Sequence, residues 1–250
     1  MRHPWGVEST PEPDRGAQPP ALRRRDTRLD SYVDRYAART HGMTASAIRA
    51  LFAVANRPEV VSLAGGMPNI ADLPLDVVGA TLSDLVQDRG LQAMQYGAGQ
   101  GEQEIREAIC EVMRLEGISA HPDDVTVTVG SQQALDLVTR IFCDPGDVVL
   151  CEAPSYVGAL GVFRSFQCEV AHVAMDEQGL VPEALHEAVL ALRAAGRSVK
   201  FVYTIPSFHN PAGVTQSLER REAILAVAEE ADLLVIEDNP YGLLGFDADP

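Results

Sequence analysis

The sequence predicts an α/β protein with a mainly parallel sheet that is covered by helices on both faces. Three observations predict this class. Short apolar runs alternate with segments of helical periodicity, polar residues gather directly after those runs, and the 250-residue composition is that of an ordinary globular protein. Hydrophobic residues make up 46% and charged residues 22%, which indicates a folded chain with a sizeable core.

The N-terminal part of the chain predicts an arm followed by a helical segment. Residues 1–28 carry five prolines within the first twenty positions and almost no periodic apolar pattern, so we expect a flexible arm. Apolar residues then recur with helical spacing from Tyr32 to Ala55, which predicts a helical segment within residues 29–74. The remaining residues, 75–250, are expected to form one large domain.

The large domain begins with two predicted helices and continues as alternating strands and helices. Helical patterns at about 75–88 and 102–116 precede the first apolar run. Strands are predicted at 125–129, 147–151, 169–173, 201–204 and 233–236, with helices between them at 131–142, 155–166, 182–194 and 217–231. This rhythm is typical of crossover connections between parallel strands.

The charge balance argues against two classes of partner. Asp and Glu number 36 against 20 Lys and Arg, which gives a formal net charge of −16. Such a field repels phosphate backbones and anionic lipid surfaces, so we expect neither nucleic acid nor a membrane as partner. No run of residues approaches the roughly 18 apolar residues of a membrane-spanning helix.

Cysteine and histidine usage indicates a reduced chain without a metal. The four cysteines form no C-x-x-C pair and stand in apolar surroundings, which favours a cytoplasmic location. The six histidines show no spacing typical of metal ligands, so we expect no metal site.

Polar residues after the first predicted strand suit an anion. Ligands of open parallel sheets bind at the carboxyl ends of the strands. The segment from Gly130 to Gln133 opens a helix there, and its backbone N–H groups with the side chains of Ser131 and Gln132 suit a phosphate. The same pattern also fits a plain helix cap by Ser131.

Three later residues stand at comparable positions. Tyr156 follows the second predicted strand, where its ring either lies over a planar ligand or packs in the core. Asn210 stands in an Asn-Pro-x-Gly turn, which the turn alone explains, although its amide can also donate to a ligand oxygen. Asp238 ends the apolar run 233–236, and a buried carboxylate needs a partner such as a protonated pyridine nitrogen.

A phosphate nest, a stacking ring, donors for a ring oxygen and a carboxylate for a ring nitrogen are the binding groups of pyridoxal 5′-phosphate. With these motifs, the sequence resembles the class I/II aminotransferases of pyridoxal-phosphate fold type I over about residues 44–250. Within that family it is most similar to the 2-aminoadipate aminotransferase-like group. The segments 45–49 and 62–68, Ala-Ser-Ala-Ile-Arg and Ser-Leu-Ala-Gly-Gly-Met-Pro, carry this narrower likeness.

The resemblance implies a cofactor role for each of these residues. Ser131 and Gln132 would hold the phosphate, and Tyr156 would stack on the pyridine ring. Asn210 and Tyr241 would bond the phenolic oxygen, and Asp238 would keep the ring nitrogen protonated.

The resemblance also implies substrate and subunit contacts. Tyr96 is similar to a tyrosine that reaches the phosphate of a neighbouring subunit, which implies a homodimer. Gly66, Arg49 and Asn210 are expected to bind the substrate. Arg49 either pairs with a distal carboxylate of the substrate or is a surface arginine of its helix. His209 departs from the glutamine that usually precedes Asn-Pro in the family.

The family's cofactor-binding lysine has no counterpart at its expected place. In the family this lysine follows the Asp-x-x-Tyr motif on the next strand, whereas the only lysine here is Lys200, at the start of the fourth predicted strand. We expect Lys200 to lie at the end of the sheet opposite the cofactor. The resemblance also implies two further strands between the first and the fifth, and a C-terminal small domain. We therefore expect a fragment or a truncated gene model that is inactive alone, with a short non-catalytic protein that binds the cofactor as the alternative.

The expected function is transfer of an amino group between an L-amino acid and a 2-oxo acid, with pyridoxal phosphate as cofactor. Two alternatives stay open. A C–S lyase of the same fold shares nearly every residue discussed above. An aminotransferase-like effector domain of a transcription regulator needs a DNA-binding winged helix ahead of it, for which the arm of residues 1–28 is too short.

Overall fold

The computed structural model describes residues 30–42, 57, 59–61, 70 and 72–245. Contacts divide the chain into two compact units, residues 1–38 and 39–250. The first described residues form two short 3-10 helices, η1 (Asp30–Arg35) and η2 (Ala38–Gly42). The expected arm and most of the helical pattern that ends at Ala55 lie outside the described residues.

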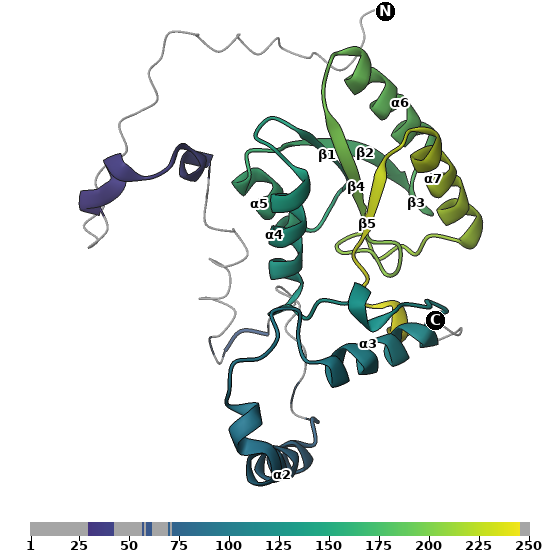
Figure 1. Ribbon diagram of the computed structural model, residues 1–250. Coiled ribbons are helices and arrows are strands. Elements are labelled where there is room, and N and C mark those ends of the chain that lie inside the picture. Colours follow the sequence, from purple (N-terminus) through teal and green to yellow (C-terminus); the bar gives the residue numbers. More distant parts are fainter. Residues whose placement is uncertain (1–29, 43–56, 58, 62–69, 71, 246–250) are drawn as a thin grey trace, which may run out of the picture. The chain divides into compact units, whose positions relative to one another are not determined.

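A five-stranded sheet forms the centre of the second unit (Figure 1). Its order is β3-β2-β1-β4-β5, and the pairs β1·β2, β1·β4 and β4·β5 are parallel. Only β3, a two-residue strand beside β2, is antiparallel. The strands are β1 (Val148–Ala153), β2 (Glu169–Asp176), β3 (Gly179–Leu180), β4 (Val199–Thr204) and β5 (Leu234–Glu237). The predicted mainly parallel α/β sheet is confirmed.

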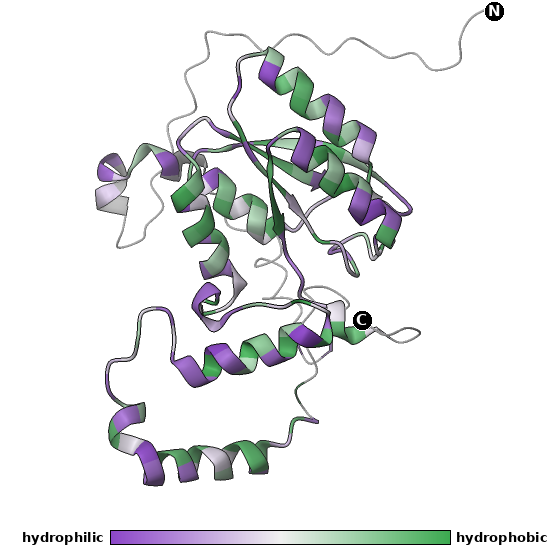
Figure 2. Cartoon of the chain, turned by 45° about the vertical axis from the view of Figure 1, so that its right-hand side comes forward, coloured by the Kyte–Doolittle hydropathy of each residue, from purple (hydrophilic) through white to green (hydrophobic). Residues whose placement is uncertain are grey.

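Helices cover both faces of this sheet (Figure 1). The helices α4 (Ser131–Phe142) and α5 (Val157–Ser165) pack on one face, and α6 (Pro182–Ala194) and α7 (Leu218–Glu230) on the other. Successive strand residues point to opposite faces, so Val149 and Cys151 join the core under α4 and α5 while Leu150 joins the core under α6 and α7. Figure 2 shows the resulting hydrophobic strands between helices with one hydrophobic side.

Aromatic packing closes the core under α5. Phe163 of α5 is buried and meets the rings of Phe201 and Tyr203 of β4 edge to face, each with centroids 5.6 Å apart. This edge-to-face geometry is the one that aromatic quadrupoles favour. The contact fixes α5 against the middle of the sheet.

Two longer helices precede the sheet in the chain. The helix α2 (Leu75–Ala93) runs five residues past its predicted end, with a non-helical backbone at Arg89, and α3 (Gln103–Leu115) matches its prediction closely. Arg106 of α3 donates to the carbonyl oxygens of Gly101 and Pro122, which anchors the short helix η3 (Pro122–Asp124). A last short helix, η4 (Gly242–Leu244), follows β5. No helix among the described residues has the length and apolar character needed to cross a bilayer.

The first predicted strand, 125–129, is wrong: within the described residues this segment pairs with no strand. Its N–H groups bond elsewhere, from Val127 to the carbonyl of Gln100 at 2.8 Å and from Val129 to the side chain of Gln133 at 2.6 Å. An apolar extended run becomes a strand only when a neighbouring backbone completes the ladder. The two further strands that the resemblance places between this segment and β5 are not part of the described sheet.

We predict that Phe163→Ala destabilises the chain strongly. The substitution removes a buried ring that contacts two others, so the free energy of unfolding should fall by about 3–5 kcal/mol. Urea denaturation followed by circular dichroism measures this. The control is Phe142→Ala at the end of α4, where the ring is 42% exposed. Equal losses in both variants would contradict the assigned core.

Candidate functional site

Three parallel strands bring the predicted polar segments to one edge of the sheet. The strands β1, β4 and β5 are neighbours and end at Ala153, Thr204 and Glu237. The pairing continues one step further, because the N–H of Asp238 donates to the carbonyl of Thr204 at 3.0 Å. The loops that follow these three strands therefore all begin at the same edge of the sheet, which is where ligands of such sheets bind.

Asp238 is held by a tyrosine that sequence reasoning missed. The hydroxyl of Tyr203, a buried residue of β4, donates to Oδ2 of Asp238 at 2.5 Å. Burial first, and then the hydrogen bond to and charge of Asp238, raise the pKa of Tyr203 well above its usual value. The hydroxyl therefore stays a donor at neutral pH. The missed signal is a tyrosine within an apolar strand, since a buried phenol needs a hydrogen-bond partner.

Tyr156 lies where the chain leaves β1 and enters α5. Its side chain is half-buried and packs against the core cluster that includes Tyr203. The ring lies over Gly158, where an added Cβ would come within 2.5 Å of two ring carbons and the hydroxyl oxygen. Only glycine fits at that position with the ring in this place.

The start of α4 has the backbone expected of an anion site. Gly130 is the N-cap at φ 75° and no side chain caps the helix, so the interpretation of Ser131 as a cap is wrong: Ser131 is the first helical residue and is exposed. The side-chain amide of Gln132 donates to the carbonyl of Gly158 at 3.3 Å. This bond ties the start of α4 to the turn that carries Tyr156.

Asn210 stands in a tight turn after β4. The N–H of His209 donates to the carbonyl of Val214 at 2.8 Å, and the carbonyl of His209 accepts from Gly213 at 2.6 Å. Gly213 has φ 73°, a conformation that favours glycine. Asn210 itself is half-buried at the head of this turn.

Four further predicted site residues are Tyr241, Tyr96, Gly66 and Arg49. Tyr241 is half-buried and directly precedes η4. Its segment is held by Asn239, whose side chain accepts from the N–H of Gly242 at 2.9 Å and donates to Glu116 at 2.7 Å. Tyr96 is 99% exposed. Gly66 and Arg49, both expected to bind the substrate, lie outside the described residues.

A buried carboxylate lies directly below this edge. Glu152 is completely buried and accepts from the hydroxyl of Thr204, the N–H of Ile205 and the amide of Gln216 at 2.8 to 3.0 Å. Sequence reasoning gave Glu152 no role. The sequence pattern that could have identified it is an acidic residue at the end of an apolar run, which is the pattern that identified Asp238.

Lys200 lies at the opposite end of the sheet, as predicted. It is the second residue of β4, and its Nζ stands 3.2 Å from Oδ2 of Asp147, just before β1. Burial alone would raise the pKa of Asp147, but hydrogen bonds from Asp144, Ser198 and Lys200 lower it. Thr204, at the carboxyl end of the same strand, is four residues further along β4.

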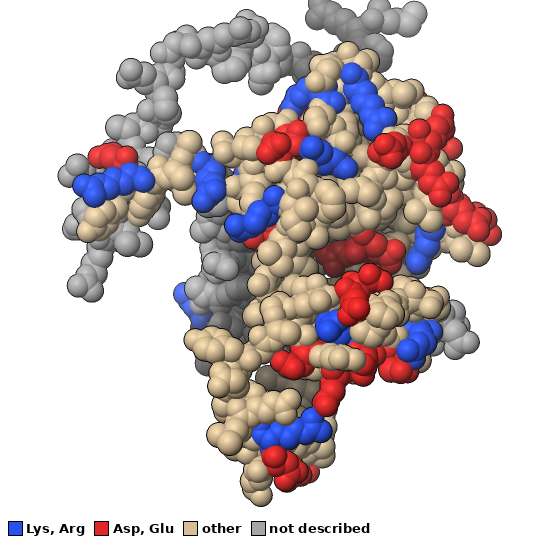
Figure 3. Space-filling model, in the orientation of Figure 1, with Lys and Arg blue, Asp and Glu red and all other residues tan. Residues whose placement is uncertain are grey.

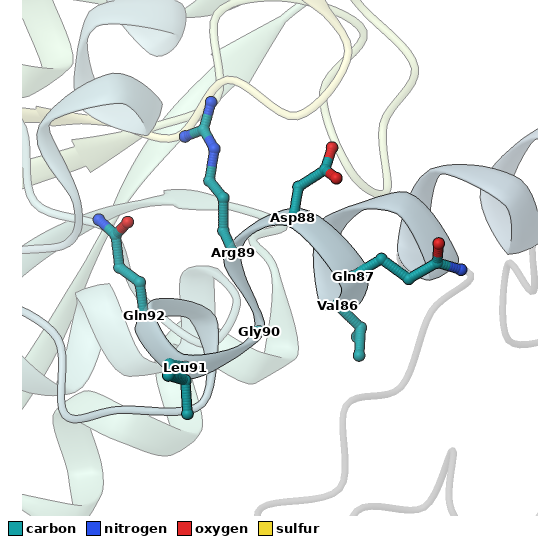
Figure 4. Close-up of a pocket in the computed structure, with 7 residues that line it drawn as sticks. All are labelled: Val86, Gln87, Asp88, Arg89, Gly90, Leu91 and Gln92. Atoms are coloured by element: carbon teal, nitrogen blue, oxygen red, sulfur yellow. The ribbon is translucent and has the colours of Figure 1, made fainter.

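Other surfaces formed by the described residues carry fewer groups that could bind a ligand. The hollow beside the kink of α2 is lined by residues 86–92 alone, and their side chains diverge (Figure 4). Figure 3 shows acidic and basic side chains on the same face, with acidic ones along its right-hand side where α7 lies and again around α3. Within the described residues, no group of three or more His, Cys, Asp or Glu side chains is placed to hold a metal ion.

Parallel strands that all end in polar loops at one edge define an open α/β sheet, and ligands of such sheets usually bind at that edge. The model of the family described as "Aminotransferase class I and II" matches residues 58–250. The chain therefore belongs to the class I and II aminotransferases.

Relatives and solved structures agree with this family. The chain is 39% identical over 220 residues to aromatic-amino-acid aminotransferase 1 of Thermococcus litoralis, covering 88% of the chain and 53% of the relative. It is 37% identical over 202 residues to the 2-aminoadipate transaminase of Thermus thermophilus, covering 81% and 48%. The crystal structure of Pyrococcus horikoshii kynurenine aminotransferase in complex with PMP superposes with a TM-score of 0.80, at 37% identity, covering 87% and 54%. The chain thus spans about half the length of the relatives it matches.

We predict that Tyr203→Phe destabilises the chain, because the substitution removes the donor to the carboxylate of Asp238. A hydrogen bond to a charged group contributes about 1.5–3 kcal/mol, so the free energy of unfolding in urea should fall by that amount. Tyr96→Phe removes a hydroxyl from a 99% exposed side chain and serves as the control. An equal change in the two variants would show that the bond to Asp238 contributes nothing.

Proposed function

We propose that this chain supplies the pyridoxal 5′-phosphate site of an aminotransferase that moves an amino group from an L-amino acid to a 2-oxo acid. The observation that carries the proposal is Asp238, a carboxylate at the carboxyl end of β5 held by the hydroxyl of Tyr203, in a chain of this family. A fixed carboxylate at that edge is suited to hold a proton on a pyridine nitrogen.

The residues at the edge fit the cofactor. The start of α4 has an N-cap glycine and no side-chain cap, which suits a phosphate group. Among the described residues, the buried hydroxyl of Ser155, next to Tyr156, has no hydrogen-bond partner of its own. Oδ2 of Asp238 accepts from Tyr203, and a carboxylate has further lone pairs to offer. Donors and acceptors are thus left at this edge for a polar ligand, which supports the proposed cofactor site.

Each side chain then has a defined task. Ser131 and Gln132 bind the phosphate with the N–H groups of the first turn of α4, and Tyr156 stacks on the ring. Asn210 and Tyr241 orient the phenolic oxygen, and Asp238 holds the proton at the ring nitrogen. When bound, pyridoxal phosphate supplies an electron sink for the charge that develops at the α-carbon of the substrate.

The proposed substrate class rests on the relatives' names and on the expected role of Arg49. The relatives act on aromatic amino acids and 2-aminoadipate, and we propose an amino donor of one of these kinds for the whole enzyme. Gly66, Arg49 and Asn210 are the proposed substrate-binding residues, with Arg49 pairing with a distal carboxylate where the donor has one.

We propose a cytoplasmic homodimer with two structural parts, residues 29–74 beside the substrate entrance and residues 75–250 as the cofactor-binding domain. Two observations support this. The four cysteines are free, as in a reducing compartment, and Tyr96 exposes its whole side chain, which suits a residue that reaches a neighbouring subunit. Sedimentation analysis of the chain measures the oligomeric state.

The proposal predicts that Asp238→Asn weakens cofactor binding. Pyridoxamine 5′-phosphate binds without a covalent bond, so fluorescence titration of the 250-residue chain measures its affinity directly. Losing a charge-assisted hydrogen bond should weaken the affinity about tenfold to a hundredfold. The control, Asp232→Asn, changes an exposed residue just before β5 and should leave the affinity unchanged. Absence of saturable binding by the unsubstituted chain would refute the proposed function.

The place of Lys200 predicts the outcome of borohydride reduction. Lys200 is paired with Asp147 at the far end of β4, so pyridoxal phosphate held at the carboxyl edge is out of its reach. After reduction of the chain with bound pyridoxal phosphate, peptide mass mapping should find no stoichiometric pyridoxyl group on Lys200. A full adduct on this lysine would mean that the cofactor binds at the other edge.

A further inference from the structure

Glu152 is a buried charge without a cationic partner. Both its carboxylate and the imidazole of His209 are fully inaccessible to solvent. Oε1 accepts from Thr204 and Gln216, and Oε2 accepts from the N–H of Ile205 at 2.9 Å and lies 2.9 Å from Nε2 of His209. Among the described residues no Lys or Arg is paired with Glu152, so polar donors alone compensate its charge. These hydrogen bonds fix the orientation of the carboxylate.

The tautomer of His209 follows from its neighbours. Nδ1 accepts a hydrogen bond from the N–H of Ala212 at 3.2 Å, so this nitrogen carries no proton. In the neutral ring the proton is then on Nε2, the atom that faces Glu152. The geometry at Nε2 is not that of a formed hydrogen bond, although Oε2 is only 2.9 Å away. The imidazole is therefore held by a hydrogen bond at Nδ1 and by electrostatic attraction to Glu152 at Nε2.

The same histidine builds the turn that carries Asn210. Its N–H donates to Val214, its carbonyl accepts from Gly213, and its ring accepts from Ala212, so three bonds of the turn meet in one residue. Asn210 is the next residue in the chain. Any displacement of the imidazole therefore moves the backbone from which the amide of Asn210 projects.

The far end of the turn is fixed to the same carboxylate. Gln216 donates from its side chain to Glu152 and to Thr204, both at 3.0 Å, and its N–H donates to the carbonyl of Pro206 at 2.8 Å. Gln216 packs closely on Gly179, where an added Cβ would lie 2.7 Å from its Cγ. Glu152 thus holds both ends of the loop between β4 and α7.

We propose that Glu152 and His209 are positioning residues that fix the amide of Asn210 for the phenolic oxygen of the cofactor. This inference rests on the proposed function. Neither residue is proposed to touch the cofactor, and both act through Asn210. Apolar side chains could fill the same space without a charge, so the carboxylate is best explained by the direction that it imposes on the turn.

The test compares two replacements of His209 in the 250-residue chain. His209→Gln keeps one donor and one acceptor, whereas His209→Leu keeps neither at similar size. We expect His209→Leu to weaken binding of pyridoxamine 5′-phosphate about tenfold or more and His209→Gln to retain affinity within about threefold. Glu152→Gln leaves one oxygen for four donors and should match His209→Leu. His186→Leu, on α6, is the control and should bind like the unsubstituted chain.

A double-mutant cycle separates positioning from plain stability. If His209 acts through Asn210, the variant with both His209→Leu and Asn210→Ala should bind no more weakly than Asn210→Ala alone. Amide hydrogen exchange at Ala212 and Gly213 should also quicken in His209→Leu and not in His209→Gln. Circular dichroism confirms that each variant is folded, and Glu152→Gln replaces His209→Leu in the cycle if the latter unfolds.

The possible outcomes are distinct. Unchanged affinity in His209→Leu and Glu152→Gln, or losses that simply add to that of Asn210→Ala, would overturn the positioning role while leaving the proposed function intact. No binding of pyridoxamine 5′-phosphate by the unsubstituted chain would reject both. A loss in His209→Leu that His209→Gln restores, and that vanishes in the Asn210→Ala background, supports the inference.

Discussion

The parallel pairing of β4 with β1 on one side and β5 on the other sets the position of every polar group at the carboxyl edge. Because the three strands run in one direction, Glu152, Thr204 and Asp238 meet there although they are far apart in the chain. Two side chains of β4 also form hydrogen bonds to residues of the neighbouring strands. Thr204 donates to Glu152 of β1, and Tyr203 donates to Asp238, which follows β5. The backbone ladder places these groups, and the side-chain bonds fix their directions.

The two carboxylates at this edge have different surroundings and so suit different tasks. Glu152 is completely buried and surrounded by protein donors, which leaves it nothing to offer a ligand. Asp238 is half-buried and accepts from Tyr203. A saturated carboxylate organises the loop around it, whereas a carboxylate with accessible surface can bind a further group.

Periodicity predicted the elements well where a local pattern decides them. The helices at 131–142 and 182–194 agree with α4 and α6 at both ends, because their apolar spacing and boundaries are local signals. The segment 125–129 forms no strand among the described residues, because strand formation depends on a neighbouring backbone as well as on a local pattern. Asp238 was singled out from the sequence, but Tyr203 and the group around Glu152 were not, since their roles arise from contacts between residues 35 to 64 positions apart.

The position of Lys200 has a practical consequence for handling the chain. It is the only lysine among 250 residues, and it stands at the amino end of β4 beside Asp147. Reagents that acylate amines therefore find one side-chain attachment point. A dye or a surface tether attached to Lys200 would lie at the edge of the sheet opposite Asn210 and Asp238. The chain can therefore be labelled or immobilised while its polar loops stay accessible.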